Sequence, residues 1–164
     1  MPADAIQNPP DRIRTERVAP EDNLAEIVRD INAASWDDGN AMSAYSVPDL
    51  EHYLMQQDNV FVTCYVDSAK GPTLLGIASA RFQTKPYDRE RWLYVDEIDV
   101  CADQRRRGAG GALMKKLLAL ADENDCEELW LGTETDNAPA NALYRSLDPD
   151  AEEAVIGYTY EMPD

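Results

Sequence analysis

The chain is poor in cysteine and histidine and has no long apolar run, and each shortage argues against a class of protein. Its 164 residues contain Cys64, Cys101 and Cys126, with no Cys-x-x-Cys pair, and the single histidine His52. We do not expect a zinc site built from these residue types. We expect the cysteines to be free thiols in a reducing cytosol. No run of about eighteen apolar residues occurs, and Met1–Asp11 is polar and proline-rich. We therefore expect a cytoplasmic protein without a membrane span or signal peptide.

Positive charge is also scarce. The sequence has 15 Lys and Arg residues against 32 Asp and Glu residues, a formal net charge of −17. Such a surface repels nucleic acid and anionic membranes, so neither is expected as a partner. It would attract a cationic small molecule. Solubility alone, or a high-salt habitat, remains open as an explanation, because many carboxylates fall where loops or helix ends are expected.

Apolar periodicity predicts the order of the elements. The length fits one domain over residues 12–164, preceded by a disordered arm over residues 1–11. The pattern predicts a strand, two helices, three strands, a helix, a strand, a helix and a strand. The strands are expected at Ile13–Val18, Val60–Val66, Leu74–Phe82, Trp92–Val100, Leu129–Thr133 and Val155–Met162. The helices are expected at Pro20–Trp36, Val47–Gln57, Ala112–Asn124 and Pro139–Leu147.

A glycine-rich turn joins the fourth expected strand to the third expected helix. It reads Arg105-Arg106-Arg107-Gly108-Ala109-Gly110-Gly111. Glycine allows positive φ and close approach of a ligand to the backbone, and the first N–H groups of a helix attract anions. The turn is therefore suited to a pyrophosphate, and the three arginines add positive charge. The Lys-Ser/Thr of a P-loop and the third glycine of a dinucleotide fingerprint are missing. An ordinary turn with solvated arginines remains the alternative.

Two motifs resemble those of the GNAT N-acetyltransferase superfamily. Arg105-x-x-Gly108-x-Gly110 is similar to its acyl-CoA pyrophosphate loop, and Asn137-x-x-Ala140-x-x-Leu143-Tyr144 to a later motif. The resemblance implies an α+β fold with one mixed sheet of six to seven strands and about four helices. It also implies acetyl-CoA as co-substrate, without a metal, bound by the whole turn from Arg105 to Gly111, including Ala109. Asn137 would help to hold the pantetheine arm, and Tyr144 would lie near the sulfur.

Acetyl transfer to an amine needs a group that accepts a proton, because an aliphatic ammonium has a pKa near about 10. Alternation along a strand places Glu97 and Asp99 on one face and Ile98 and Val100 on the other. Two carboxylates are costly as core filling. Glu97 is therefore the first candidate base and Asp99 the second, although a β-bulge could change which one faces the cleft. Salt bridges to the arginines of the turn are the alternative role.

The resemblance also assigns the remaining catalytic parts. The main chain at Ile98 and Val100 would meet the acetyl-pantetheine arm, and an N–H there could polarise the thioester carbonyl. Tyr144 is the candidate general acid for the leaving sulfur, with core packing as its alternative role. Cys101 lies close to the loop but has no neighbouring histidine in the sequence to activate it. A covalent acyl-cysteine route is therefore not expected.

A narrower resemblance concerns the acceptor. From about Leu50 onward the chain is similar to aminoglycoside 3-N-acetyltransferases of the gentamicin type, which implies acetylation of a polycationic amine. Asp148 stands where that family usually has a glycine, and this departure puts the acceptor side in doubt. Glu134 and Asp136 could bind a cationic acceptor or simply form a turn. Another amine acceptor, or a non-catalytic acyl-CoA sensor, remains an alternative, and the possibility of a homodimer is left open.

Overall fold

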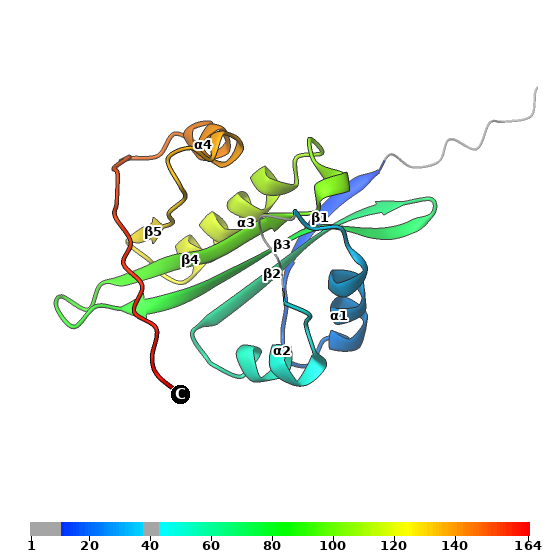
Figure 1. Cartoon of the computed structure of the whole chain (residues 1–164), viewed down its shortest axis with the longest axis horizontal. Helices are drawn as coiled ribbons and strands as arrows, with labels where there is room; N and C mark the ends of the chain where they lie inside the picture. The colour runs from blue at the N-terminus through cyan, green and yellow to red at the C-terminus, as the bar shows by residue number, and fades with distance from the viewer. Residues whose placement is uncertain (1–10, 38–42) are drawn as a thin grey trace, which may run out of the picture. The chain divides into compact units, whose positions relative to one another are not determined.

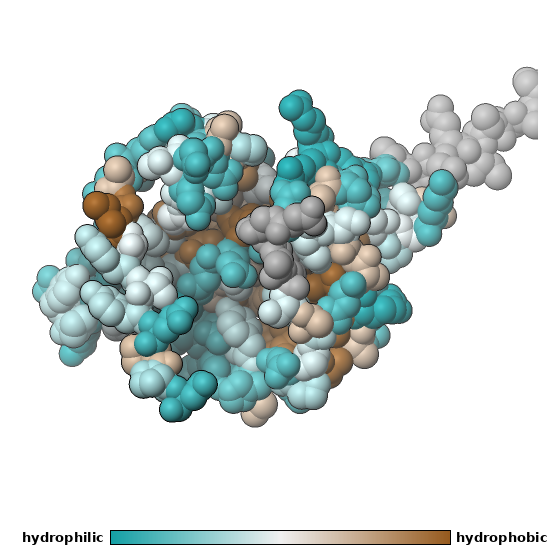
Figure 2. Space-filling model, viewed as in Figure 1, coloured by the Kyte–Doolittle hydropathy of each residue, from teal (hydrophilic) through white to brown (hydrophobic). Residues whose placement is uncertain are grey.

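The computed structural model describes residues 11–37 and 43–164, which belong to two compact units, Met1–Trp130 and Leu131–Asp164. The expected disordered arm lies outside the described residues, apart from Asp11. Among the helices of the described residues, none is long and apolar enough to cross a membrane. Hydrophilic side chains cover most of the surface in view, as the acidic composition predicts (Figure 2).

The first unit is built on one mixed sheet in the order β1-β2-β3-β4-β5 (Figure 1). Neighbours from β1 to β4 are antiparallel, and β5 pairs with β4 in parallel. The predicted mixed sheet is confirmed, but the described residues form five strands, not the six to seven expected. The strands are β1 (Arg12–Arg17), β2 (Asn59–Ser68), β3 (Gly71–Thr84), β4 (Arg91–Val100) and β5 (Glu128–Trp130).

Helices lie on both faces of this sheet. The helix α3 (Ala109–Glu123) places its buried residues Leu113, Leu117 and Leu120 against one face. The helices α1 (Leu24–Ala33) and α2 (Val47–Leu54) pack on the other face, around a core that includes Ile31, Leu50 and Ile77. A short 3-10 helix over residues 102–104 precedes α3. The sheet therefore has an α3 face and an α1/α2 face.

The helix α1 begins four residues later than predicted. Pro20 falls in a turn, because the Asp22 carboxylate accepts a 2.7 Å hydrogen bond from the Ala19 N–H. The Asn23 side chain then accepts from the Glu26 N–H and forms the N-cap. Local side-chain bonds of this kind favour caps over continued helix. The helix therefore starts at Leu24.

The second unit contains one regular element, α4 (Ala138–Arg145). No residue between 131 and 164 is fully buried. Arg145 at the end of α4 makes a two-pronged ion pair with Glu152, at 2.5 and 2.9 Å. Local polar contacts therefore contribute much of the order in this unit.

The strand predicted at Val155–Met162 is not formed, so that prediction is wrong. No helix or strand follows Arg145, and the apolar side chains of this segment are 62% to 80% exposed. The alternation of apolar residues there is compatible with a strand. A strand also needs a hydrogen-bonded neighbour, however, and the described structure pairs this segment with none. Its absence accounts for one of the missing strands.

Candidate active site

The glycine-rich turn is fixed at its start by two backbone hydrogen bonds. The Cys101 N–H donates to the Leu75 carbonyl at 2.8 Å, and the Ala102 N–H donates to the Ser35 carbonyl at 2.7 Å. The first bond holds the end of β4 to β3, and the second holds it to the chain that follows α1. Gly108 has φ of 81° and is the N-cap residue of α3. The turn thus joins a firmly held strand to the beginning of a helix.

The N-terminus of α3 has no internal cap. Gly108 provides no side chain, and the Ala112 N–H is the first in the helix to bond back to this turn, at 3.0 Å to the Gly108 carbonyl. The N–H groups of Ala109, Gly110 and Gly111 have no acceptor within the described residues. A Cβ at Gly108 would meet nothing within 4 Å. The backbone donors at this end of α3 are therefore open to a ligand.

The three arginines of the turn differ in their surroundings. Arg105 forms an ion pair with Asp37. Arg107 donates to the Gln104 side chain at 2.7 Å and pairs with Asp11 at 3.5 Å. Arg106, with φ of 60°, is exposed and makes no ion pair in the described part of the chain. Arg106 is therefore the guanidinium most available to an incoming anion.

A β-bulge in β4 changes which face its side chains occupy. Val95 pairs with Ala80 and Glu97 pairs with Ser79, so Asp96 is an extra residue without a partner in β3. An extra residue reverses the alternation of side chains beyond it. Before the bulge, the residues on the α3 face are Leu93 and Val95; after it they are Ile98 and Val100.

The bulge brings Glu97 and Asp99 onto the α1/α2 face. Asp99 pairs with Ile77, which belongs to the core under α1 and α2, and Glu97 pairs with Ser79. Glu97 is exposed and Asp99 is partly buried. The two carboxylates share one face, as alternation predicts. The sequence allowed for a bulge but did not locate it.

The main chain of β4 is accessible along part of one edge. β5 pairs with β4 only over Trp92–Tyr94. Beyond Tyr94, the described structure provides no strand partner on the side of β4 away from β3. Ile98 and Val100, the residues whose main chain the resemblance assigned to the cofactor arm, belong to this unpaired stretch.

Tyr45 is a site residue that the sequence did not reveal. The Asn32 side chain donates to its carbonyl and accepts from its N–H, both at 2.9 Å, and its ring lies 6.0 Å from that of Phe61. Burial raises the pKa of Tyr45, and the charges of Glu97 and Asp99 raise it further. A neutral phenol therefore lies near the two carboxylates. Tyr45 was missed because it falls in a connection without apolar periodicity.

Tyr53 and Arg81 organise the same face beside the bulge. The Tyr53 hydroxyl lies 3.2 Å from the Val60 carbonyl and 3.1 Å from the Ala80 carbonyl. Burial, followed by the charge of Asp96, raises the pKa of Tyr53 to about 12. Asp96 is held by Arg81 at 2.7 Å. Asp96 is therefore engaged in an ion pair, which leaves Glu97 and Asp99 as the candidate bases.

Aromatic side chains continue this face toward β5. The rings of Trp92 and Tyr94 are stacked with centroids 5.8 Å apart, and Tyr94 lies 6.0 Å from Trp130. The Lys85 ammonium lies 3.9 Å from the centre of the Trp92 ring and 2.5 Å from the Tyr94 hydroxyl. Aromatic faces attract cations and sugar rings, so this row could contribute to an acceptor surface. The sequence analysis did not single out this row, although the i, i+2 spacing of Trp92 and Tyr94 on a strand places both rings on one face.

Cys101 is not arranged as a nucleophile. Its side chain is 1% exposed, and its thiol lies 3.4 Å from the Leu74 carbonyl. Burial, with a smaller effect of Asp103, raises its pKa to about 12. The thiolate would be a negligible fraction at neutral pH. The structure therefore supports the expectation that no acyl-cysteine forms here.

In the second unit, Asn137 is occupied by a structural role. Its side-chain oxygen accepts from the Ala140 N–H at 3.3 Å, and its amide donates to the Thr133 hydroxyl at 3.1 Å. Tyr144 is partly buried on α4. Glu134 and Asp136 are exposed in the turn before α4. Asn137 is thus first of all the N-cap of α4, a role that its motif did not indicate.

The substitution of Asp148 for the family's glycine has a visible backbone consequence. Asp148 has φ of 51°, and its N–H donates to the Arg145 carbonyl at 3.2 Å. This left-handed conformation is the one that glycine adopts freely and that aspartate tolerates. The end of α4 therefore adopts, without a glycine, a backbone turn that glycine favours.

These features define an acyltransferase type of domain. The strand β4 carries two carboxylates on one face, and the uncapped N-terminus of α3 follows this strand. On the side away from β3, β5 pairs with β4 in parallel. The chain belongs to the acetyltransferase (GNAT) family, whose model matches residues 25–148, and it is an acetyltransferase of this family. A search of curated protein sequences found no match.

Solved structures share the fold at low sequence identity. An aminoglycoside acetyltransferase from an uncultured soil metagenomic sample, in complex with trehalose, is 19% identical with a TM-score of 0.77. The match covers 92% of this chain and 97% of that one, and the same enzyme has been solved with sisomicin. AAC(6')-Iy, in complex with the bisubstrate analogue CoA-S-monomethyl-acetylneamine, is 17% identical with a TM-score of 0.66, and the match covers 92% of this chain and 99% of that one. A transcriptional regulator from Bacillus halodurans is 14% identical with a TM-score of 0.69, covering 91% and 100%.

Proposed function

We propose that this protein is an acetyl-CoA-dependent N-acetyltransferase that acts on a primary amine of a polycationic small molecule. The observation that carries the proposal is the uncapped N-terminus of α3 directly after a strand whose carboxylates share one face. The first feature is suited to a pyrophosphate and the second to a proton from an ammonium group. Family membership supports the pairing of these two features.

The residues present fit the pyrophosphate of CoA. The N–H groups of Ala109, Gly110 and Gly111 would donate to its oxygens, and Gly108 leaves room for their approach. Arg106 would supply charge, while Arg105 and Arg107 would have to exchange partners to do so. The main chain of Ile98 and Val100 would bind the pantetheine arm along the unpaired edge of β4, and Asn137 would assist if its amide leaves Thr133.

Acetyl-CoA supplies the acetyl group as a thioester when it is bound. Glu97 would accept a proton from the acceptor ammonium, directly or through water, and Asp99 is the second choice. A backbone N–H of β4 would polarise the carbonyl. Tyr144 would return a proton to the sulfur, a role that rests on its motif and not on its position. The acceptor attacks directly in a ternary complex, without an acyl-enzyme.

We propose an aminoglycoside as the acceptor, with 3-N-acetylation as the expected chemistry. The acidic surface, the exposed Glu97 and the aromatic row on the same face suit a cationic sugar-like molecule. Glu134 and Asp136 are further candidate contacts, since both carboxylates are exposed. The neighbouring soil enzyme was crystallised with sisomicin, which makes this class the first to test.

The test is release of CoA thiol from acetyl-CoA with gentamicin, kanamycin, spermidine, free amino acids and a short peptide, at low and high salt. Release with an aminoglycoside, and a product heavier by one acetyl group, supports the proposal. Release with another amine alone keeps the reaction and corrects the acceptor. Tight acetyl-CoA binding without turnover on any amine would overturn the proposed enzymatic activity and favour a non-catalytic acyl-CoA sensor.

The proposed base is tested by Glu97→Gln, with Glu51→Gln on the exposed face of α2 as a charge-matched control. Removing a general base costs roughly 100-fold to 10,000-fold in rate, so kcat should fall by about this much in Glu97→Gln. The affinity for acetyl-CoA should stay the same. An unchanged kcat would transfer the role to Asp99 or to water.

A further inference from the structure

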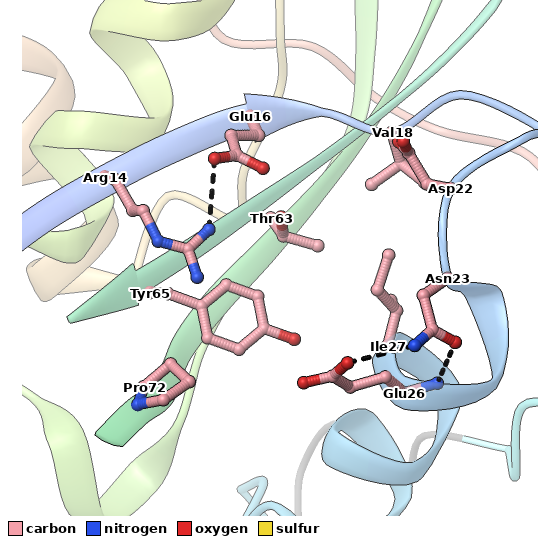
Figure 3. A pocket seen from close by; sticks show the side chains of 10 residues that line it. All are labelled: Arg14, Glu16, Val18, Asp22, Asn23, Glu26, Ile27, Thr63, Tyr65 and Pro72. Carbon is pink, nitrogen blue, oxygen red and sulfur yellow. Dashed lines mark hydrogen bonds and ion pairs between the residues drawn. The ribbon is translucent and has the colours of Figure 1, made fainter. Parts of the chain in front are cut away.

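A pocket of about 220 Å³ lies on the α1/α2 face between β1, β2 and the start of α1 (Figure 3). It is separate from every residue assigned to acetyl transfer. Arg14 and Glu16 of β1 line one side, and Asp22 and Glu26 at the start of α1 line the opposite side. Thr63 of β2 lies between these two groups.

The charges around this pocket do not balance. Four carboxylates share the guanidinium groups of Arg14 and Arg29, and a fifth carboxylate, Asp22, has neither. Arg14 pairs with Glu16 at 3.1 Å and with Asp67 at 2.9 Å; Arg29 pairs with Glu26 at 3.7 Å and with Asp30 at 2.8 Å. The Asp22 carboxylate has no cationic partner in the described residues and accepts only the Ala19 N–H. A cation in the pocket would be attracted and an anion repelled.

The arrangement of the carboxylates suits an organic cation better than a metal ion. Within the described residues, no group of three or more potential ligands could hold a metal. The carboxylates are therefore spread around the rim and not gathered at one point. This arrangement suits an ammonium group, which donates several hydrogen bonds in different directions.

Thr63 gives an independent indication of a ligand. Its side chain is 3% exposed, and its hydroxyl makes no hydrogen bond within the described residues. No fully enclosed polar side-chain atom of those residues lacks a partner, so this hydroxyl is reached from the pocket. The hydroxyl therefore takes its hydrogen-bond partner from whatever fills the pocket, water or a ligand. Thr63 thus offers a donor and an acceptor at the base of the pocket.

The size and the remaining lining limit the ligand to one ring. Ligand pockets for drug-sized molecules measure about 300–1,000 Å³, so this pocket is too small for a whole aminoglycoside. Val18, Ile27 and Pro72 supply apolar surface, and the Tyr65 ring lies at one side. We propose that the pocket binds one small protonated amine carried on a hydroxylated ring, with its ammonium at Asp22 and a hydroxyl at Thr63.

This site is distinct from the acetyl-transfer site. Glu16, Thr63, Ile77 and Asp99 are paired in one row across β1 to β4. Three strand spacings of about 4.8 Å put Asp99 roughly 14 Å from Glu16. Ile77 is buried in the core between them. One small ring therefore cannot occupy both places, and the proposal does not depend on the proposed function.

The test is amide-resolved NMR of the full chain, titrated with trans-4-aminocyclohexanol and, separately, with cyclohexane-1,4-diol. The amine should cause saturable shifts at Asp22, Ile27 and Thr63, and the diol should bind about tenfold more weakly or not at all, because it lacks the charge. Shifts confined to Glu97 and Asp99, no saturable shift in the pocket, or equal binding of the two compounds would overturn the proposal.

Two variants and two matched controls identify the contacts. Asp22→Asn keeps an oxygen for the Ala19 N–H and should weaken the amine about fivefold to tenfold, while the neighbouring Glu21→Gln should have no effect. Thr63→Val should weaken it about threefold, while Thr73→Val on the exposed part of β3 should not. If Thr63→Val fails to fold, Asp22→Asn decides alone. Equal affinity of Asp22→Asn and Glu21→Gln would overturn the site.

Discussion

The N-termini of α3 and α4 differ in whether a side chain of the protein accepts hydrogen bonds from their unpaired N–H groups. Both helices begin with N–H groups that have no partner inside the helix. α4 satisfies one of them with the side chain of Asn137, and α1 and α2 do likewise with Asn23 and Ser46. α3 begins with Gly108 and has no side-chain cap. Three of the four α-helices in the described residues are self-capped, so the open end of α3 is a specific feature of its turn.

The comparison shows how a sequence can leave the backbone donors of a helix N-terminus free for a ligand. A residue such as serine at position 108 would offer α3 a cap of its own and compete with an anion. Glycine leaves the donors free and provides the positive φ of the turn. The stability that a cap would add is thus left to a bound ligand, which stabilises the folded state by mass action.

The largest expected effect comes from closing the open end. Gly108→Val should reduce acetyl-CoA affinity at least about 100-fold, because a branched side chain would occupy the approach to the backbone donors. It should also destabilise the protein by about 1–2 kcal/mol through its φ of 81°. Calorimetric titration and thermal unfolding would measure both. Gly157→Val, which has open space and no positive φ, is the control; an unchanged affinity in Gly108→Val would refute the loop assignment.

The next effect tests the self-capped end. Asn137→Ala should lower the free energy of unfolding by about 1 kcal/mol, because the Ala140 N–H loses its acceptor. Asn137→Ser should keep most of that stability, since serine also caps. Denaturant unfolding of both variants separates capping from binding. A higher KM for acetyl-CoA in Asn137→Ser would show that the amide serves the cofactor arm, and an unchanged KM would leave Asn137 a structural residue.

A smaller effect distinguishes the arginines that flank the open end. Arg106→Gln should weaken acetyl-CoA binding about threefold to tenfold at low salt and less at high salt, because an exposed charge is screened. Arg107→Gln should have less effect, since Arg107 is already engaged by Gln104 and Asp11. Binding titrations at two salt concentrations measure both. The opposite order of effects would mean that the two side chains exchange roles on binding.

The smallest effect concerns the other end of α4. Asp148→Gly should stabilise the protein by about 0.5 kcal/mol, because relief of the left-handed strain slightly exceeds the entropy gained by the unfolded chain. Asp150→Gly lacks the positive φ and should destabilise it by a similar amount. Thermal unfolding of the two variants gives the comparison. Equal shifts in both would show that the conformation at Asp148 stores no strain.

The parts that the sequence predicted well depend on local signals. Glycines and arginines between an apolar run and a helical pattern located the turn before α3, although α3 begins at Ala109, three residues earlier than predicted. Periodicity located α2, β2 and β4 within a few residues. The α1/α2 face was harder, because it depends on pairing between distant strands. The sequence signal for a bulge near Asp96 is weak: the apolar residues change from odd positions before it to even positions after it.

The errors have physical reasons of the same kind. Val155–Met162 has strand-like alternation, but no local signal shows whether a pairing partner exists. Tyr45 became visible only when α1 and β2 placed it near the carboxylates. The role of Asn137 as the N-cap of α4 was not predicted, and its assignment to the cofactor stays a prediction. Each error concerns a contact that the chain makes outside the element in question.

The extra residue at Asp96 sets a rule for how this chain can change in length. The β3–β4 connection between Thr84 and Arg91 lies at the surface, where insertions and deletions are tolerated best. If β4 kept all its residues but paired with β3 without the bulge, Glu97 and Asp99 would turn under α3, and Ile98 and Val100 would turn to the α1/α2 face. Deletion of Asp96 itself would remove the bulge and leave these four side chains on their present faces. Protein engineers who alter this enzyme can therefore remove the bulge residue, but must preserve the pairing of Glu97 with Ser79 and of Asp99 with Ile77.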